Sequence, residues 1–163
     1  MKRETIENIF NFLKEKEDKE IPEIWSVVEK LETHPDGIQY KHNGDLSLYN
    51  RNITKLPNDL YVNGFLDLDS CKKLTELPDK LHVGDWLDIR GCNQLTELPN
   101  NLYVGDWLAL PYTNISEIPN NLYVGNDLYV YNTPLANKYT DEEIRDIVTS
   151  KGGTIIGGIY VIF

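Results

Sequence analysis

Histidines, cysteines and hydroxyl side chains are the residues that catalysis or metal binding would use first. The histidines are few, and His42 and His82 stand where neighbouring segments of the chain carry Val or Tyr, so a repeated structural position accounts for them. No serine or threonine has a histidine and a carboxylate at a recognisable spacing, and no zinc-ligand pattern occurs. The sequence therefore predicts a protein that is not an enzyme, with no catalytic residue, no metal ligand and no cofactor.

The clearest chemical pattern is one of aromatic and acidic residues. Phe65, Trp86 and Trp107 follow one another at a spacing of 21 residues, and Asp67 and Asp88 share that spacing. Aromatic rings in register with carboxylates are typical of interfaces, because rings bury a large area at low entropy cost and acids select positive partners. Such a pattern requires a framework with the same period.

That framework is a tandem repeat. A Leu-Pro or Ile-Pro pair recurs at residues 56–57, 77–78, 98–99 and 118–119. An apolar-x-apolar motif, beginning with Leu46 and Leu48, recurs with the same period of 20 or 21 residues. A unit this short cannot close a core and must stack on its neighbours. The alternation suits a short strand with both apolar side chains inward, which predicts five short parallel strands centred on residues 47, 67, 88, 109 and 129.

The consensus L-x-x-L-P-x-x-L-x-V-G-x-x-L-x-L resembles leucine-rich repeats of the short bacterial class, as in the YopM and IpaH effectors and in small repeat proteins of bacteria and tailed phages. The resemblance covers residues 38–139, five coils, and implies an α/β fold: a right-handed leucine-rich-repeat solenoid that binds proteins. The asparagine position of the family is held here by Arg51, Cys71, Cys92, Thr113 and Thr133. Nothing matches the ligase domain of the IpaH effectors, so that activity is not implied.

Alternation also predicts which side chains leave the core. If Leu66 and Leu68 point inward, the residues between and beside them point outward. Applied to all five coils, this rule places three residues of each coil on a concave face, Ala109 among them. The candidate partner-binding set is taken from these residues: Phe65, Asp67, Asp69, Trp86, Asp88, Arg90, Trp107, Tyr129 and Tyr131. The alternative is that these rings pack on one another. A second column, which would extend this surface or cover the core edge, consists of Tyr61, His82, Tyr103 and Tyr123.

Two further features of the repeat carry predictions. Gly84, Gly105 and Gly125 stand three residues before the first apolar residue of a strand, where a turn with positive φ is expected. Cys71 and Cys92 share one repeat position, so stacked coils about 4.8 Å apart could join them in a disulfide. The alternative, favoured by the scarcity of cysteine, is a pair of buried thiols that donate to the turn backbone.

Both ends of the repeat array are expected to be capped. For the N-terminal cap, residues 1–37, apolar spacing predicts one helix through Ile6 and Leu13 and a second helix that includes Leu31. For the C-terminal cap, residues 140–163, Thr140 and Glu143 predict a capping box and a helix. The apolar segments 154–156 and 159–163 flank a Gly-Gly pair, which predicts a β-hairpin.

Composition limits the partner. The 163 residues carry 26 acidic and 16 basic side chains, a formal net charge of −10, which argues against direct binding to nucleic acid. No apolar run approaches the roughly 18 residues that a membrane span requires, and the first residues lack the apolar core of a signal peptide. We therefore expect a cytoplasmic protein of a bacterial or phage-infected cell, a monomer or weak dimer, whose partner is a protein with a basic or mixed surface.

These observations favour a non-catalytic protein-binding module that acts by occlusion. The phage resemblance implies one specific use, the inhibition of a host or defence protein through the acidic aromatic face. A secreted effector-like adaptor is an alternative on the same resemblance. A glycan-binding repeat protein, which would stack sugars on Trp86 and Trp107, is another.

Overall fold

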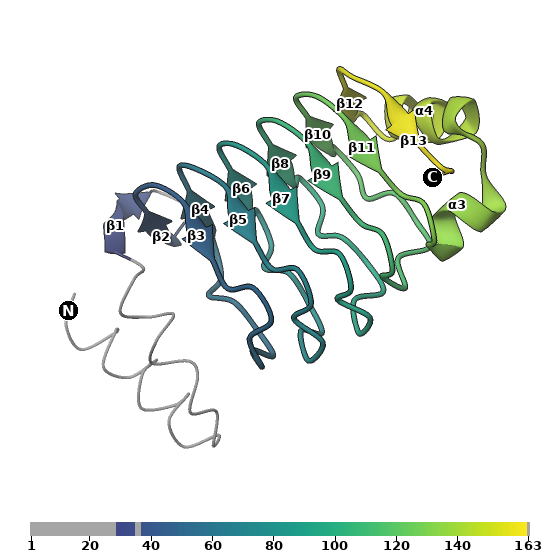
Figure 1. Ribbon diagram of the computed structural model, residues 1–163. Coiled ribbons are helices and arrows are strands. Elements are labelled where there is room, and N and C mark those ends of the chain that lie inside the picture. Colours follow the sequence, from purple (N-terminus) through teal and green to yellow (C-terminus); the bar gives the residue numbers. More distant parts are fainter. Residues whose placement is uncertain (1–28, 35–36, 163) are drawn as a thin grey trace.

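The chain folds as a parallel β-solenoid with two sheets and little helix (Figure 1). The computed structural model describes residues 29–34 and 37–162, with side chains from residue 41 onward. A six-stranded sheet holds β3 (Leu46–Ser47), β5 (Leu66–Asp67), β7 (Leu87–Asp88), β9 (Leu108–Ala109), β11 (Leu128–Tyr129) and β13 (Ile159–Tyr160). All its neighbours pair in parallel, with Leu46 beside Leu66 and Leu66 beside Leu87. The five predicted strand positions and their parallel pairing are confirmed.

A second sheet, which sequence analysis did not predict, runs beside the first. Its strands are β1 (Glu29–His34), β2 (Gly37–His42), β4 (Leu60–Val62), β6 (His82–Val83), β8 (Tyr103–Val104), β10 (Tyr123–Val124) and β12 (Thr154–Ile155). Pairing is parallel from β2 to β12 and antiparallel only between β1 and β2. Each coil thus passes through the seven-stranded sheet, turns a corner, and enters the six-stranded sheet.

The core lies between the two sheets and the irregular return segment of each coil. In one coil, Leu60, Val62, Leu66 and Leu68 are all completely buried, and the same positions are buried in the following coils. Burying one such side chain contributes about 1.5–3 kcal/mol. The repeated apolar positions therefore supply a continuous core along the whole array.

Two columns of left-handed residues turn the chain at the remaining corners. One column follows the six-stranded sheet: Asn50, Ser70, Gly91, Tyr112 and Asn132, with φ between 56° and 68°. The other precedes the seven-stranded sheet: Asp59, Lys80, Asn101, Asn121 and Gly152, with φ between 54° and 76°. Asn, Asp and Gly reach this conformation most easily, which explains their recurrence at 20- and 21-residue spacing within the regular coils.

The prediction of positive φ at Gly84, Gly105 and Gly125 is wrong, because these residues are not among the glycines in the left-handed region. They are needed for close approach between coils instead. A Cβ on Gly105 would lie 2.1 Å from the carbonyl oxygen of Gly84, and a Cβ on Gly125 would lie 2.0 Å from that of Gly105. Only glycine, which has no Cβ, allows the backbones of neighbouring coils to approach this closely at the corner between the two sheets.

The C-terminal segment corrects another prediction. Helix α3 (Pro134–Lys138) precedes α4 (Asp141–Ser150), which begins after Thr140 with the expected capping box to Glu143. The predicted hairpin is wrong: β12 pairs with β10 and β13 pairs with β11, both in parallel. Residues 157–158 take the corner that Asn126 and Asp127 take in the previous coil, so the Gly-Gly pair leads from one sheet to the other.

The N-terminal helical cap falls largely on residues 1–28, which lie outside the described residues. Leu31, predicted to be helical, lies in strand β1, so this part of the prediction is wrong. Hydrogen bonding to β2, which extends the seven-stranded sheet, outweighs the helical spacing of the apolar residues there. No helix within the described ranges has the length and apolar character needed to cross a membrane.

Candidate partner-binding face

The outward side chains of the six-stranded sheet form the candidate site, called here the outer face. The structure brings the predicted aromatic residues into one column. The ring centroids of Phe65 and Trp86 are 4.1 Å apart and those of Trp86 and Trp107 are 4.7 Å apart, with interplanar angles of 6° and 4°. The predicted self-packing of these rings is therefore present. Both faces of the Trp86 indole are covered by its neighbours.

The column changes direction at Trp107. The ring of Tyr129 meets Trp107 edge-on, with centroids 6.3 Å apart and an interplanar angle of 85°. Tyr129 then stacks on Tyr160, at 4.9 Å and 12°. Tyr160 was not among the predicted site residues, because the hairpin prediction removed its strand from the sheet. Its spacing from the apolar Ile159 and Val161 was the signal that could have placed it on this face.

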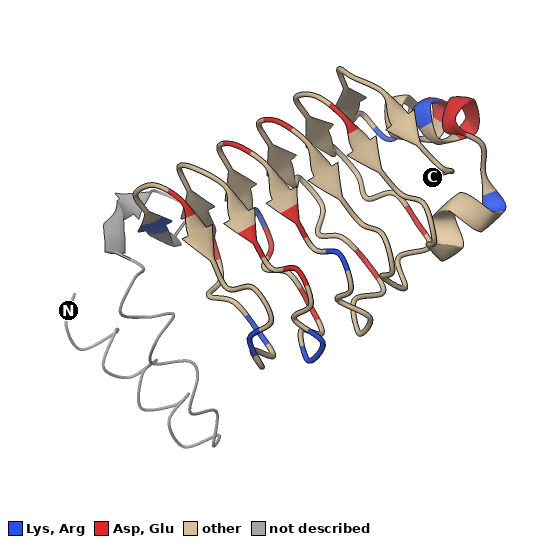
Figure 2. Cartoon of the chain, viewed as in Figure 1, with Lys and Arg blue, Asp and Glu red and all other residues tan. Residues whose placement is uncertain are grey.

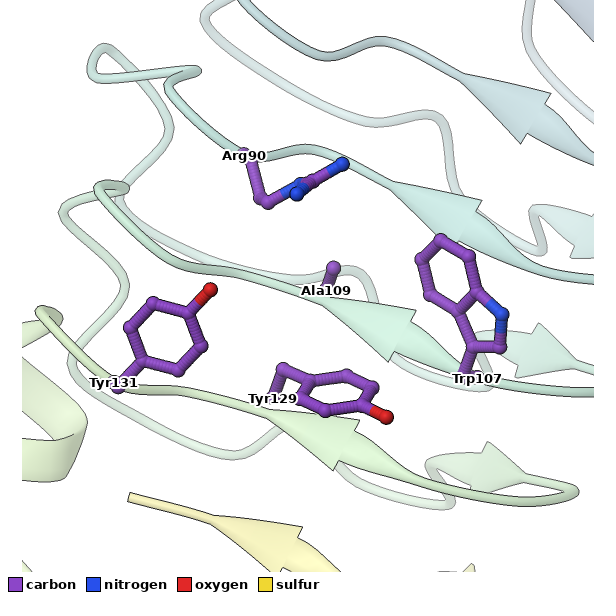
Figure 3. Close-up of a pocket in the computed structure, with 5 residues that line it drawn as sticks. All are labelled: Arg90, Trp107, Ala109, Tyr129 and Tyr131. Atoms are coloured by element: carbon purple, nitrogen blue, oxygen red, sulfur yellow. The ribbon is translucent and has the colours of Figure 1, made fainter. Parts of the chain in front are cut away.

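A pocket of about 270 Å³ opens on the outer face where the column turns. Figure 3 shows Ala109 at its floor, with Arg90, Trp107, Tyr129 and Tyr131 around it. Those four surrounding residues were predicted from sequence to lie on this face. Ala109 was also predicted to point outward but was not among the candidate partner-binding residues. Its short side chain creates the space, because neighbouring coils carry Asp88 or Tyr129 at the same position.

Asp88 and Arg90 form one unit beside this pocket. Asp88 is 3% exposed. Its carboxylate accepts hydrogen bonds from Arg90 Nε at 3.0 and 2.9 Å and from Arg90 Nη2 at 2.5 Å. Arg90 Nη2 also lies 4.0 Å from Asp69 Oδ2. The prediction that Asp88 is an outward acid available to a partner is wrong, since Asp88 is buried and its charge is compensated by Arg90.

Other carboxylates keep the outer face acidic (Figure 2). Asp67 accepts a hydrogen bond from Ser47 Oγ at 3.0 Å. Asp127 accepts from the Gly158 N–H at 2.7 Å and from the Tyr129 hydroxyl at 3.3 Å. Burial, together with the nearby Asp127, raises the pKa of Tyr129, which stays a neutral donor. Five aspartates and one arginine occupy the outward positions: Asp45, Asp67, Asp69, Asp88, Asp127 and Arg90.

A second aromatic column lines the seven-stranded sheet. The rings of Tyr61, His82, Tyr103 and Tyr123 stack in that order, with centroids 4.1, 4.2 and 4.7 Å apart. The Lys41 ammonium lies 5.7 Å from the Tyr61 ring. Burial between two tyrosine rings lowers the pKa of His82, so this imidazole is neutral at pH 7. His82 thus serves as a flat aromatic member of the column.

Cys71 and Cys92 are buried thiols that do not form a disulfide, as the thiol alternative predicted. The thiols of Cys71 and Cys92 donate to the carbonyl oxygens of Leu48 and Leu68 in the preceding coils, each at 3.1 Å. The hydroxyls at the same repeat position behave in a related way, since Thr113 donates to Leu110 O at 2.7 Å. Burial, with Cys71 nearby, raises the pKa of the Cys92 thiol to about 12. These thiols are therefore structural.

Within the described ranges, no three His, Cys, Asp or Glu side chains converge to form a metal site. Fold and face together define a repeat solenoid that presents an aromatic and acidic surface. Comparison with protein-family models, curated proteins and solved structures gave no match.

Proposed function

We propose that this chain is a leucine-rich-repeat binding protein without catalytic activity, which covers the surface of a partner protein with its outer face. The repeat period, the inward leucines and the parallel strands support the repeat class. So does the position of Cys71, Cys92 and Thr113, whose side chains donate to turn carbonyls where the family uses asparagine. The proposed setting is the cytoplasm of a bacterial or phage-infected cell.

The pocket around Ala109 carries the proposal. Trp107 is held by stacking on Trp86, and Tyr129 is held between Trp107 and Tyr160, so the pocket walls are ordered before a partner arrives. Preorganised aromatic walls reduce the entropy lost on binding. A pocket of this kind is where one anchoring side chain of a partner makes the largest contribution to affinity.

The charges around the pocket indicate the rest of the partner's footprint. Asp67, Asp69 and Asp127 are partly exposed, while Arg90 is compensated by Asp88. A partner with lysine or arginine around a central anchor fits this distribution, and association should slow as salt rises. Inhibition by occupying a basic groove of a host or defence protein is the specific form of occlusion that we propose.

The glycan alternative receives less support. Sugars bind aromatic residues through an open ring face, whereas Phe65 and Trp107 cover both faces of Trp86. An effector-like adaptor would use the same outer face, so it differs from the inhibitor in the partner's fate and in the compartment rather than in the site.

The proposal is tested by filling the pocket. Ala109→Trp should occupy the space between Trp107 and Tyr131 without touching the core, since Ala109 lies at the floor of an open pocket. The control is Thr96→Trp, which introduces the same side chain at an exposed position on the return segment. Wild-type protein and each variant are immobilised and exposed to lysate of candidate host cells, and retained proteins are compared by quantitative mass spectrometry.

We expect a protein retained by wild type and by Thr96→Trp to be reduced at least tenfold with Ala109→Trp. A photo-crosslinking residue at position 131 should also join the same protein, and one at position 96 should not. Equal retention by Ala109→Trp, with crosslinking only from position 96, would place the binding site away from the outer face.

A further inference from the structure

Strand β13 leaves one edge of the six-stranded sheet open. It pairs with β11 on one side, and no other strand of the described ranges pairs with its other side. Leu128 N–H donates to Gly158 O and Val130 N–H donates to Tyr160 O, both at 2.9 Å. In a parallel pair, alternate residues bond to the same neighbour. The N–H and C=O groups of Ile159 and Val161 therefore point to the open edge.

The adjacent edge, at β12, is closed differently. The Arg145 guanidinium of helix α4 donates to Ile155 O at 2.9 Å and to Gly157 O at 2.7 Å. These carbonyls occupy the positions that accept hydrogen bonds from the following coil elsewhere in the array, as Val104 O does from Gly125 N–H. A charged side chain thus ends the seven-stranded sheet, in the way that proteins commonly protect sheet edges.

Helix α4 lies close to β13 as well as to β12, but among the described residues no charged side chain donates to the edge of β13 as Arg145 does at β12. Residues 152–163 contain no charged side chain, although 26% of the chain is charged. Tyr160 is 44% exposed and Ile162 is 82% exposed. Lysine, proline and β-bulges are the usual devices that prevent pairing at an edge, and none occurs in β13. The edge is therefore competent to pair with another strand.

We propose that β13 pairs antiparallel with β13 of a second copy of this chain, about a two-fold axis at Tyr160. Ile159 and Val161 lie symmetrically on either side of Tyr160, and both direct their backbone groups outward. The axis places Ile159 opposite the second copy's Val161, and Val161 opposite the second copy's Ile159. Each such pair exchanges both N–H···O=C bonds. The edge is self-complementary, which is what a two-fold interface requires.

The side chains agree with this pairing. One face of the Tyr160 ring stacks on Tyr129, and its strand neighbour on the other side would be Tyr160 of the second copy. The two six-stranded sheets would form one continuous sheet. The contact strands carry no charged side chain, whereas each chain has a net charge of −10, so the two copies repel each other through charges outside the contact. Salt screens this repulsion and should therefore strengthen the dimer. This is opposite to the salt effect expected for a basic partner on the outer face.

Disulfide trapping tests the axis. In an antiparallel pair, residues facing each other on the axis have Cβ atoms about 4.5–5.5 Å apart, close to disulfide geometry. Tyr160→Cys should therefore give a disulfide-linked dimer under mild oxidation, while Ile156→Cys, an exposed control on the edge closed by Arg145, should remain monomeric. The native cysteines are buried and do not interfere. Equal crosslinking of both variants would overturn the proposal.

Sedimentation equilibrium of the full chain supplies the second measurement. We expect a monomer–dimer equilibrium whose dissociation constant rises at least tenfold in Ile162→Lys, which places a charge next to the edge, and is unchanged in the control Ile156→Lys. The dissociation constant of the wild type should fall as salt rises. A wild-type chain that stays monomeric up to about 1 mM would overturn the proposal. A concentration-dependent series of larger species would indicate head-to-tail stacking of β13 on β3 and would also overturn it.

Discussion

The carboxylate of Asp88 is buried on the outer face of a sheet and is covered by the guanidinium of Arg90, two residues further along the chain. Arg90 also donates its backbone N–H to Asp88 Oδ1 at 3.0 Å, so the pair fixes the course of the chain as it leaves β7. The Arg90 side chain is 46% exposed and lines the pocket around Ala109. One ion pair therefore supports both the strand end and the candidate site.

Arg90→Ala should lower the free energy of unfolding by about 1–3 kcal/mol, because it leaves the Asp88 carboxylate without its cation. The lower part of that range is expected, since water can reach the space that Arg90 leaves. The double variant Asp88→Ala/Arg90→Ala should recover part of the loss, because the next coil carries Ala109 at the position of Asp88. Urea unfolding of both variants measures the effect. A double variant less stable than Arg90→Ala alone would contradict this explanation.

The six-stranded sheet could be predicted from sequence because Leu66, Leu87 and Leu108 repeat with one period and alternate with polar residues. The strands of the seven-stranded sheet are two or three residues long in most coils, which is too short for an alternation of apolar and polar residues to be recognised in the sequence. The corner glycines were recognised, but their reason was not: the contact with the neighbouring coil's carbonyl exists only once coils are stacked.

The candidate site shows the same limit. Alternation placed Arg90, Trp107, Tyr129 and Tyr131 on one face, and the structure brings them around one pocket. The pocket itself depends on Ala109, whose small size carries no signal in sequence. The burial of Asp88 was equally hidden, because an acid on an outward position looks exposed until its arginine partner is placed.

Both cysteines should be unreactive in the native protein and fully reactive after unfolding. With a pKa of about 12, Cys92 is thiolate in only about one molecule in 10⁴ at pH 8, and the thiolate is the reactive form. Thiol labelling without reductant should be slow in buffer and should reach two thiols per chain in denaturant. An absence of free thiols in denaturant would show that Cys71 and Cys92 are bridged.

Stability should depend on pH through His82. Its pKa is lowered in the folded chain by burial, while an unfolded histidine has a pKa near 6.5. The unfolded chain therefore binds a proton at His82 more readily than the folded chain does. The stability that neutral His82 contributes is fully present above about pH 6.5 and is lost as the pH falls toward the pKa of the folded state. His82→Tyr matches Tyr61 and Tyr103 and removes this titration. In urea unfolding between pH 7 and pH 5, the free energy of unfolding of the variant should rise relative to that of the wild type as the pH falls. A difference that does not change with pH would contradict the assignment.

Gly105→Ala should be strongly destabilising. The added methyl group would lie 2.1 Å from the Gly84 carbonyl oxygen, a backbone atom that can move only if two coils separate. We expect a loss of about 3 kcal/mol, at the upper end of overpacking effects. Asp106→Ala, at the next residue of the same corner, adds no such contact and is the control; it removes one exposed hydrogen bond, from Asn126 Nδ2 at 2.9 Å, and should cost about 1 kcal/mol or less. Thermal unfolding that leaves both variants at the same midpoint would show that the corner is not closely packed.

Lys80→Gly should stabilise the chain. Lys80 is exposed and has a φ of 57°, a conformation that costs a side-chain-bearing residue about 1–2 kcal/mol. Glycine relieves that cost but adds freedom to the unfolded chain, so we expect a net gain of up to about 1 kcal/mol. Asp79→Gly, one residue earlier and outside the left-handed region, should instead be destabilising by about 0.5–1 kcal/mol. Equal effects of the two changes in thermal unfolding would contradict this reasoning.

Helices α3 and α4 stand between β11 and β12, where earlier coils have a short irregular return, and the chain nevertheless re-enters both sheets in register. The route between the six-stranded and the seven-stranded sheet can therefore change in length and secondary structure while the strands keep their places. A foreign loop or a small domain grafted after Asn137, an exposed residue of α3, would lie on the return side. The molecule is in this respect modular, with one side fixed by coil-to-coil contact and the other open to exchange.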